Sequence, residues 1–209
     1  MNPASLHYAF IDESGTVGAS TGTHFLVVAV LTTEKPRELE LAVRRALKKV
    51  GRNTASGELK AAQASEKTLF RLLETLVRHD VSIVAVIVDQ KAIVREPEDV
   101  EEIYRRAVSR AVRQMAGHFP RLDVCLDKRY THEPLRYTLE TRIREELVEL
   151  APQMIILRHE SSQADKELPA VGAVAWAFFQ NYEREDARFY EVLAPKILVE
   201  EVIALPDWK

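Results

Sequence analysis

LHYAFID, residues Leu6–Asp12, is the stretch that decides the fold of this 209-residue chain. Its side chains are largely apolar on both alternating faces, with Tyr8 and Phe10 on one side and Ala9 and Ile11 on the other. A strand that buries both faces is typical of the centre of a sheet that helices cover from both sides. We therefore predict a central β-strand that ends in an acidic residue.

The segments that follow this strand indicate a hairpin. Ser14–Gly22 is rich in glycine, serine and threonine, which predicts a loop. His24–Thr32 is again rich in apolar and β-branched residues, so we expect it to be a second strand that pairs with the first.

The rest of the chain alternates between helical and strand-like patterns. Apolar residues at helical spacing predict helices over Pro36–Val50, Ser65–His79, Glu98–Gly117, Pro134–Leu150 and Leu168–Tyr182, the last apolar nearly all round and hence buried. Apolar and β-branched runs predict strands over Val81–Asp89, Leu122–Asp127 and Met154–His159, and Ala187–Lys209 is expected to add a short helix and a final strand. This order indicates a mixed sheet with helices on its faces, in a single α/β domain over residues 1–209.

Composition limits the classes of protein that fit. Apolar residues make up 46% of the chain and charged residues 29%, which is typical of a globular domain with a sizeable core. The longest apolar runs, Phe25–Leu31 and Ser82–Val88, are far shorter than the ~20 residues of a membrane span, and the start does not resemble a signal peptide. The single cysteine, Cys125, excludes an internal disulfide. We therefore expect a cytoplasmic protein without a membrane partner.

The net charge of −3 bears on nucleic acid as a partner. Proteins that coat phosphate backbones are usually basic, but a carboxylate-rich metal site lowers the net charge without excluding a nuclease. Two groups of basic residues are candidate phosphate-binding faces, and a solvated surface is the alternative interpretation of both. They are Arg105, Arg106, Arg110 and Arg113, and separately Lys128, Arg129 and Arg136. The oligomeric state stays open, with a homodimer as one alternative.

Three predicted strands end in an acidic residue. These residues are Asp12, Asp89 and Asp127, and each one taken alone is explained as a turn former or a helix cap. Two carboxylates on neighbouring strands repel each other, which raises at least one pKa unless a cation lies between them. Mg²⁺ and Mn²⁺ prefer such oxygen ligands, and open α/β sheets bind ligands at the carboxyl ends of their strands.

Motifs spread along the chain resemble one known family. They are Phe10-Ile11-Asp12-Glu13-Ser14-Gly15, Gly57-Glu58-Leu59-Lys60, Cys125-Leu126-Asp127, His159-Glu160-Ser161-Ser162 and Phe189-Tyr190. In this order and spacing they resemble the domain of unknown function 3800 family, which is grouped with ribonuclease H-like proteins. The resemblance runs from about Tyr8 to Ile197. It implies a ribonuclease H-like mixed β-sheet flanked by helices.

The resemblance also implies a site for divalent cations, Mg²⁺ or Mn²⁺. The implied metal ligands are Asp12, Glu13, Glu58 and Asp127, and the implied catalytic residues are Asp12, Glu58 and Asp127. In ribonuclease H-like enzymes one cation activates the attacking water and both stabilise charge on the phosphate. Glu13 is the less secure ligand because it alternates to the other face of the strand. Lys60 and Lys128 are the expected contacts to substrate, with a pair with Glu58 or a solvated surface position as alternatives for Lys60.

One position departs from the family pattern. The late helix of the family usually opens with a Leu-Gln-x-x-Asp type of motif whose aspartate completes the site, and Gly172 stands at that position here. Glycine offers no oxygen ligand. Asp165 lies seven residues earlier, about 10 Å along a helix, and Asp165 and His159 are both candidates to compensate.

Three functions compete on this evidence. The first is a divalent-metal-dependent nuclease that hydrolyses phosphodiester bonds of RNA or DNA, because Asp12 and Asp127 are present. The second is a catalytically inactive module on the same fold that binds nucleic acid or protein, because Gly172 replaces an acid. The third is a hydrolase of small phosphate esters at the same metal site.

Overall fold

The computed structural model describes residues 5–18, 22–50, 61–151, 153–162, 164–206 and 208. Two of the predicted site residues, Glu58 and Lys60, lie outside these described residues. The described part of the chain forms one sheet with helices on both of its faces.

The sheet has six strands in the order β5-β4-β1-β2-β3-β6. The strands are β1 (His7–Ser14), β2 (Phe25–Thr33), β3 (Val81–Asp89), β4 (Arg121–Asp127), β5 (Met154–Glu160) and β6 (Ile197–Ile203). β2 pairs antiparallel with both β1 and β3, whereas the β1–β4, β4–β5 and β3–β6 pairs are parallel. The prediction of a mixed sheet is therefore confirmed, and the carboxyl ends of five strands lie at one edge.

β1 occupies the centre of the sheet, as its two apolar faces predict. It pairs with β2 as the expected hairpin, and the pairing continues as far as Ser14 opposite Val27. β1 therefore runs two residues beyond the predicted end at Asp12, because the hairpin with β2 extends past that acid. On its other side β1 pairs with β4, with Phe10 beside Cys125 and Ile11 beside Leu126.

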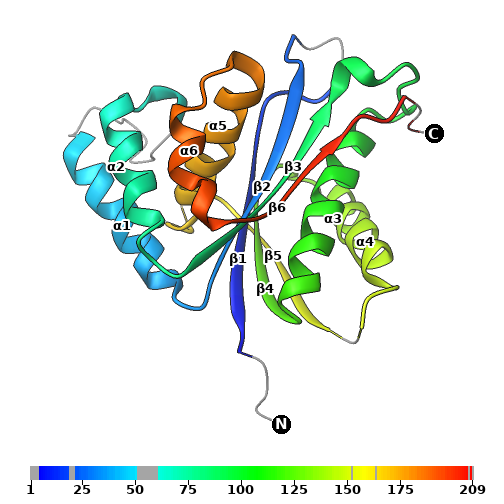
Figure 1. The fold of residues 1–209 in the computed structure, drawn as a ribbon. Helices are drawn as coiled ribbons and strands as arrows, with labels where there is room; N and C mark the ends of the chain where they lie inside the picture. The colour runs from blue at the N-terminus through cyan, green and yellow to red at the C-terminus, as the bar shows by residue number, and fades with distance from the viewer. Residues whose placement is uncertain are drawn as a thin grey trace.

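Helices form a layer on each face of the sheet (Figure 1). One layer contains α1 (Pro36–Val50), α2 (Glu66–Leu76), α5 (Leu168–Arg184) and α6 (Arg188–Leu193). The other contains α3 (Glu101–His118) and α4 (Glu133–Leu147). Short 3-10 turns at Ala61–Gln63, Gln90–Ala92 and Ala194–Lys196 complete the described elements. The α-helices match the predicted ranges to within a few residues at each end.

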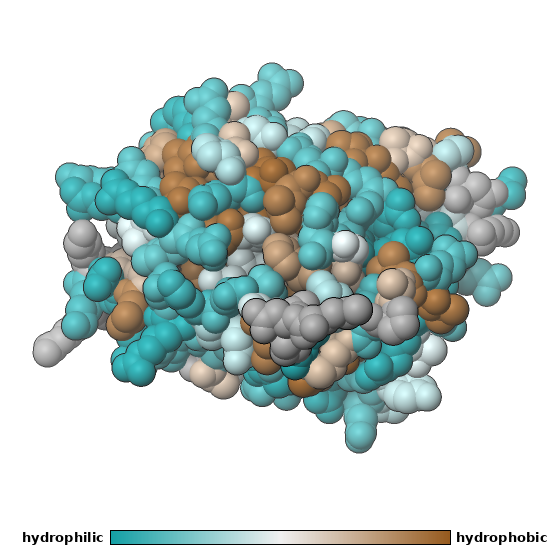
Figure 2. Space-filling model, turned by 60° about the horizontal axis from the view of Figure 1, so that its bottom comes forward, coloured by the Kyte–Doolittle hydropathy of each residue, from teal (hydrophilic) through white to brown (hydrophobic). Residues whose placement is uncertain are grey.

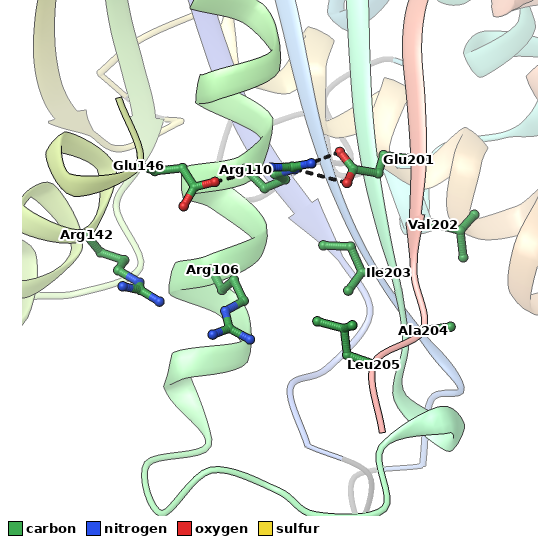
Figure 3. A pocket seen from close by; sticks show the side chains of 9 residues that line it. All are labelled: Arg106, Arg110, Arg142, Glu146, Glu201, Val202, Ile203, Ala204 and Leu205. Atoms are coloured by element: carbon green, nitrogen blue, oxygen red, sulfur yellow. Dashed lines mark hydrogen bonds and ion pairs between the residues drawn. The ribbon is translucent and has the colours of Figure 1, made fainter. Parts of the chain in front are cut away.

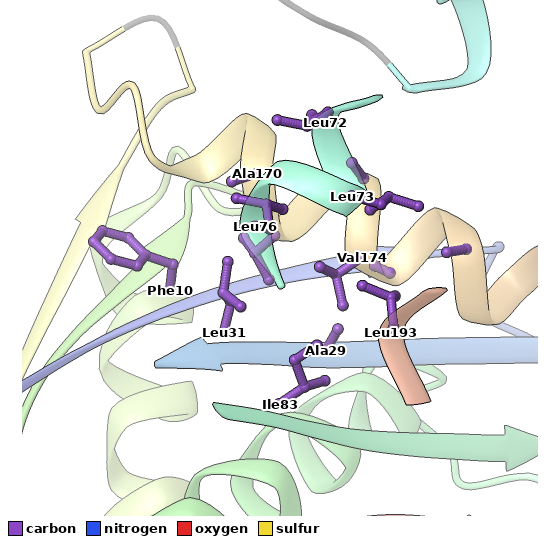
Figure 4. Packing of buried hydrophobic residues seen from close by; sticks show 14 of the residues in the cluster. Phe10, Ala29, Leu31, Leu72, Leu73, Leu76, Ile83, Ala170, Val174 and Leu193 are labelled. Atoms are coloured by element: carbon purple, nitrogen blue, oxygen red, sulfur yellow. The ribbon is translucent and has the colours of Figure 1, made fainter. Parts of the chain in front are cut away.

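The core under α5 is the larger of two hydrophobic cores. In Figure 4, Val174 of α5 points at the sheet between Leu73 and Leu193, and Ala29, Leu31 and Ile83 face it from the strands. The residues of α5 from Leu168 to Val171 and from Ala173 to Ala175 are all buried, so the prediction of a buried helix is confirmed. A stripe of α3 that includes Ile103, Ala107, Ala111 and Met115 fills the second core on the opposite face.

The last segment of the chain adds an edge strand to the sheet. Ala187–Lys209 was predicted to hold a short helix and a strand, and it forms α6, a 3-10 turn and β6. β6 pairs with β3 and is the outermost strand on that side. Glu200 accepts hydrogen bonds from the hydroxyls of Tyr182 and Tyr190, which ties the strand to α5 and α6.

The surface is mixed in character. Figure 2 shows hydrophobic residues as separate patches among hydrophilic ones on the face that it presents. In the part of the chain that the structure describes, every helix is too short or too polar to cross a membrane.

Candidate functional site

Asp12 and Asp127 come together at the carboxyl ends of two neighbouring parallel strands. Phe10 and Cys125 are paired in register and are buried in the core under α5. Because side chains alternate along a strand, the residues two positions further on, Asp12 and Asp127, project from the same face. The sequence placed these acids at strand ends, and the residues just before them, Ile11 and Leu126, are in register on strands that lie about 5 Å apart.

Gly172 lies directly against the Asp12 carboxylate. A Cβ atom built on Gly172 would be 2.6 Å from Oδ2 of Asp12 and 3.8 Å from its Cγ. Because Gly172 has no side chain, the Asp12 carboxylate fills that space beneath α5. The position at which the sequence departs from the motif it resembles therefore faces Asp12.

Backbone amides fix both carboxylates. The amide of Glu13 donates to Oδ1 of Asp12 at 2.8 Å, and the amide of Lys128 donates to Oδ1 of Asp127 at 3.0 Å. The same Lys128 amide lies 2.8 Å from the carbonyl oxygen of Glu160, which closes the turn after β4. Each bond uses one carboxylate oxygen. Both side chains are partly exposed, so solvent reaches the pair.

Glu13 points to the opposite face of the sheet. Its Oε1 lies 2.8 Å from Nη1 of Arg129, and Arg129 also binds Glu101 at the start of α3. Burial raises the pKa of Glu13, and the positive charge of Arg129 offsets part of that rise. The structure therefore separates Glu13 from the face on which Asp12 lies, as its alternation along the strand indicated.

Asp165 lies on the same face as Asp12 but further from the strand ends. Its Oδ2 accepts a weak hydrogen bond from Sγ of Cys125 at 3.4 Å. Cys125 is the register partner of Phe10, which precedes Asp12 by about 6.6 Å along the strand. Asp165 therefore lies beside Cys125, on the same face as Asp12, and does not occupy the position of Gly172.

Glu167 lies beside Asp165, and the sequence interpretation did not single it out. Burial and a hydrogen bond with Asp165 raise the pKa of Glu167 to about 7. An acidic residue directly before an apolar helix resembles an ordinary N-terminal residue in the sequence, so only its contact with Asp165 distinguishes it.

His159 lies on the other face of the sheet. It is in register with Leu126, which belongs to the core under α3, and its side chain is 7% exposed. Its Nε2 lies 3.2 Å from Oε1 of Glu140 on α4, and burial lowers its pKa against the opposing effect of that carboxylate. The sheet therefore lies between His159 and Asp12.

Most of the predicted basic faces are neutralised by acids. Arg105 binds Asp99 and Glu102, Arg110 binds Glu146 and Glu201, and Arg113 binds Glu149. Arg106 differs, since its guanidinium lies 5.1 Å from the centre of the Trp208 ring. Lys128 is exposed beside Asp127. The strand-end acid Asp89 accepts from His24 and caps a 3-10 turn, which is the structural alternative for that residue.

A groove of about 510 Å³ lies between α3, α4 and β6, away from the two carboxylates. Figure 3 shows Arg110 held between Glu146 and Glu201, with Ile203 and Leu205 on the side of β6. Since its arginines are largely paired and it lies on the far side of the sheet from Asp12, this groove is separate from the candidate site.

The strand order, the single antiparallel strand β2 and the acid at the end of central β1 define a ribonuclease H-like fold. Among solved structures, the chain is similar to ribonuclease HII of Archaeoglobus fulgidus, solved in complex with PCNA, with a TM-score of 0.55 and 15% identity over 90% of this chain and 79% of that one. It is also similar to ribonuclease H2 of Pyrococcus horikoshii, with a TM-score of 0.53 and 16% identity over 86% and 74%. The prediction of the fold class is confirmed. No family model and no curated protein matches the chain.

Proposed function

We propose that this protein is a divalent-metal-dependent nuclease that hydrolyses phosphodiester bonds of RNA or DNA. The observation that carries the proposal is the pair of Asp12 and Asp127 on one face of the sheet, at the carboxyl ends of neighbouring parallel strands. Two carboxylates so close repel each other unless a cation lies between them. The resemblance to the domain of unknown function 3800 family and the ribonuclease H-like fold support the same proposal.

The residues present fit Mg²⁺ or Mn²⁺ in part. Among the described residues, no group of three or more His, Cys, Asp or Glu side chains is arranged to hold a metal. Mg²⁺ is nevertheless often bound by one or two carboxylates and keeps several waters. Asp12 and Asp127 would hold it here, with Glu58 as the proposed third ligand from outside the described residues. When bound, the cation would activate a water and stabilise charge on the phosphate.

The other residues of the site have supporting roles in this proposal. The amides of Glu13 and Lys128 orient the two carboxylates, each through a single oxygen. Lys128 is exposed beside Asp127, where its ammonium group is available to a phosphate of the substrate. We leave Glu13 and His159 out of the primary ligand set because both lie on the other face of the sheet.

Gly172 favours a second candidate function, an inactive module that binds nucleic acid or protein. The Asp12 carboxylate already fills the space that a side chain at position 172 would need. A site that lacks this ligand holds its cation less firmly or holds one cation in place of two. Binding without turnover would then be the remaining activity of the fold.

A cleavage assay tests the nuclease proposal. Wild type, Asp12→Asn and Asp89→Asn are compared on labelled single-stranded DNA, duplex DNA, RNA and an RNA–DNA hybrid, each with Mg²⁺ and with Mn²⁺. Asp89→Asn is the matched control, because Asp89 is also a strand-end acid but caps a 3-10 turn. We expect wild type to cleave at least one of these substrates. Excess metal chelator and the Asp12→Asn substitution should each abolish this cleavage, and Asp89→Asn should retain it. Binding of these nucleic acids without cleavage by wild type would favour the inactive module, and cleavage in excess chelator would refute metal dependence.

A further inference from the structure

A buried ionic cluster lies directly behind the two carboxylates, on the α3 face of the sheet. We call it the Arg129 cluster, and it comprises Glu13, Glu101, Tyr104, Arg129 and Tyr130. Its members come from the end of β1, the turn after β4 and the first residues of α3. The side chains of Arg129 and Glu13 are 27% and 18% exposed, so solvent screens this ion pair less than it screens a surface pair.

Each of the three guanidinium nitrogens of Arg129 donates to a carboxylate oxygen. Its Nε and Nη2 lie 2.8 and 2.7 Å from the two carboxylate oxygens of Glu101, and its Nη1 lies 2.8 Å from Oε1 of Glu13. The guanidinium carbon lies 4.5 Å from the centre of the Tyr104 ring. Tyr130 donates from its hydroxyl to Glu101 at 2.5 Å. A planar fork is required for this pattern, and a lysine ammonium does not reproduce it.

The cluster joins the two strand ends that carry the candidate ligands. Glu13 follows Asp12 in β1, and its amide donates to that carboxylate. Arg129 lies two residues after Asp127, and its amide lies 2.9 Å from the Asp127 carbonyl oxygen. The ion pair between Glu13 and Arg129 therefore ties the end of β1 to the turn after β4, and Glu101 anchors both to α3.

From this geometry we propose that Arg129 is a positioning residue for the metal site. It holds the ends of β1 and β4 together on the α3 face, and this sets the separation of Asp12 and Asp127 on the α5 face. The inference rests on the proposed function, since it assigns a role to Arg129 in divalent-cation binding. Residues that orient metal ligands typically change metal affinity by 10- to 100-fold when they are replaced.

Arg105 provides a matched control for Arg129. It is also an arginine of the α3 region with two acidic partners, Asp99 and Glu102, and its side chain is 6% exposed. Among the described residues its hydrogen-bonding partners, Asp99 and Glu102, both lie at or just before the start of α3 and not at the ends of β1 or β4. Arg105→Met therefore measures the loss of ionic contacts by a buried arginine. Arg129→Met measures such a loss together with any effect on the strand ends.

The first measurement is the affinity for Mn²⁺, obtained by calorimetric titration. The melting temperature of each variant in chelator is measured as well, as a control for folding. We expect Arg129→Met to weaken Mn²⁺ binding by about tenfold or more, Arg129→Lys to recover part of the loss, and Arg105→Met to stay within about twofold of wild type. Glu13→Gln keeps an oxygen acceptor for Arg129, so it is expected to have a small effect. Equal Mn²⁺ affinity in wild type and Arg129→Met overturns the proposal. Loss of Mn²⁺ binding in Glu13→Gln at unchanged melting temperature also overturns it, because Glu13 would then be a ligand itself.

The second measurement needs no metal. Amide hydrogen exchange at Glu13 reports the bond that orients the Asp12 carboxylate, and exchange at Lys128 reports the bonds of its amide to Asp127 and to the Glu160 carbonyl. Faster exchange of both amides in Arg129→Met, but not in Arg105→Met, is the expected result, and unchanged exchange overturns the positioning role. If wild type binds no Mn²⁺, the proposed function fails and this exchange experiment still decides whether Arg129 positions the strand ends.

Discussion

At the scale of single residues, Asp12 and Gly172 form the closest contact of the candidate site that a substitution can test. The carboxylate lies where a Cβ at position 172 would be, at 2.6 Å from that atom. A distance this short is not tolerated, so any larger residue at 172 must displace the end of the Asp12 side chain. The glycine therefore leaves room for the Asp12 carboxylate in its present position.

Substitution of Gly172 tests this contact. Gly172→Ala is expected to move the Asp12 carboxylate and to weaken Mn²⁺ binding, although alanine favours a helix over glycine by about 1 kcal/mol. Gly172→Asp adds a third carboxylate to the pair of Asp12 and Asp127. It is therefore expected to lower the melting temperature in chelator and to show a larger rise of that temperature with Mn²⁺ than wild type. Thermal melts with and without Mn²⁺ measure both effects. Ala and Asp variants that bind Mn²⁺ like wild type would show that Asp12 does not depend on this space. The control is Gly117→Ala, since no atom lies near a Cβ at Gly117.

At the scale of elements, the β1–β2 hairpin decides how the central strand presents Asp12. Gly15 follows β1 directly and has a φ of 97°, a conformation that favours glycine. A Cβ at Gly15 would lie 2.4 Å from the carbonyl oxygen of Phe25. The turn therefore requires glycine for both its backbone angle and its close approach to β2.

Gly15→Ala is expected to lower the free energy of unfolding by more than the unfavourable φ angle alone would cause. Gly22→Ala is the matched control, because Gly22 has a φ of 94° but no atom within 4 Å of its Cβ position. We expect about 1 to 2 kcal/mol of lost unfolding free energy for Gly22→Ala, from the left-handed backbone alone. Gly15→Ala should cost clearly more in denaturant titrations, since the clash with the β2 backbone adds to it. Equal losses of unfolding free energy in the two variants would mean that β2 moves to accommodate the new Cβ at no cost in stability.

At the scale of the whole molecule, one acid at the start of α5, Glu167, makes stability depend on pH. The pKa of Glu167 is raised from 4.5 to about 7 by burial and by its hydrogen bond with Asp165. A carboxyl group with a raised folded-state pKa stabilises the fold below its unfolded pKa and loses that contribution as pH rises through the folded value. The contribution of Glu167 is therefore fully present below pH 4.5 and is lost as pH rises through about 7.

Glu167→Gln is expected to remove this part of the pH dependence. Relative to the variant, wild type should lose stability between about pH 5 and about pH 8, because only wild type must ionise a buried carboxyl group. Melting temperatures of both proteins across this range measure the difference. Parallel curves would show that Glu167 ionises freely in the folded state. Glu191→Gln, a substitution at an exposed acid of α6, serves as the control.

Metal binding is expected to stabilise the whole fold. A cation that binds only the folded state adds about 2.7 kcal/mol at one hundred times its dissociation constant. Wild type should therefore melt at a higher temperature in Mn²⁺ than in chelator, and Asp12→Asn should show little of this rise. Differential scanning calorimetry measures both, with Asp89→Asn as the variant expected to behave like wild type. A rise of the same size in Asp12→Asn would place the Mn²⁺ elsewhere.

The sequence by itself determined the elements of this fold and the acids at the strand ends. The period of apolar residues is a local property, so the two-sided apolar pattern of β1 and the apolar stripe of α3 identified a central strand and a core helix without any knowledge of contacts. The same local pattern placed Asp12, Asp89 and Asp127 at the ends of strands. It could not distinguish among them, because a strand-end acid has the same local pattern in a metal site and in a turn cap.

Tertiary structure alone decided which of these residues share a site. The parallel register of β1 and β4 places Asp127 beside Asp12, whereas Asp89 is two strands away and caps a turn. The contact of α5 with Asp12 and the ion pair of Glu13 with Arg129, 116 residues apart in sequence, follow from the packing of helices on the two faces of the sheet. Local periodicity carries no information about such distances, because register and helix packing are set by the burial of both cores together.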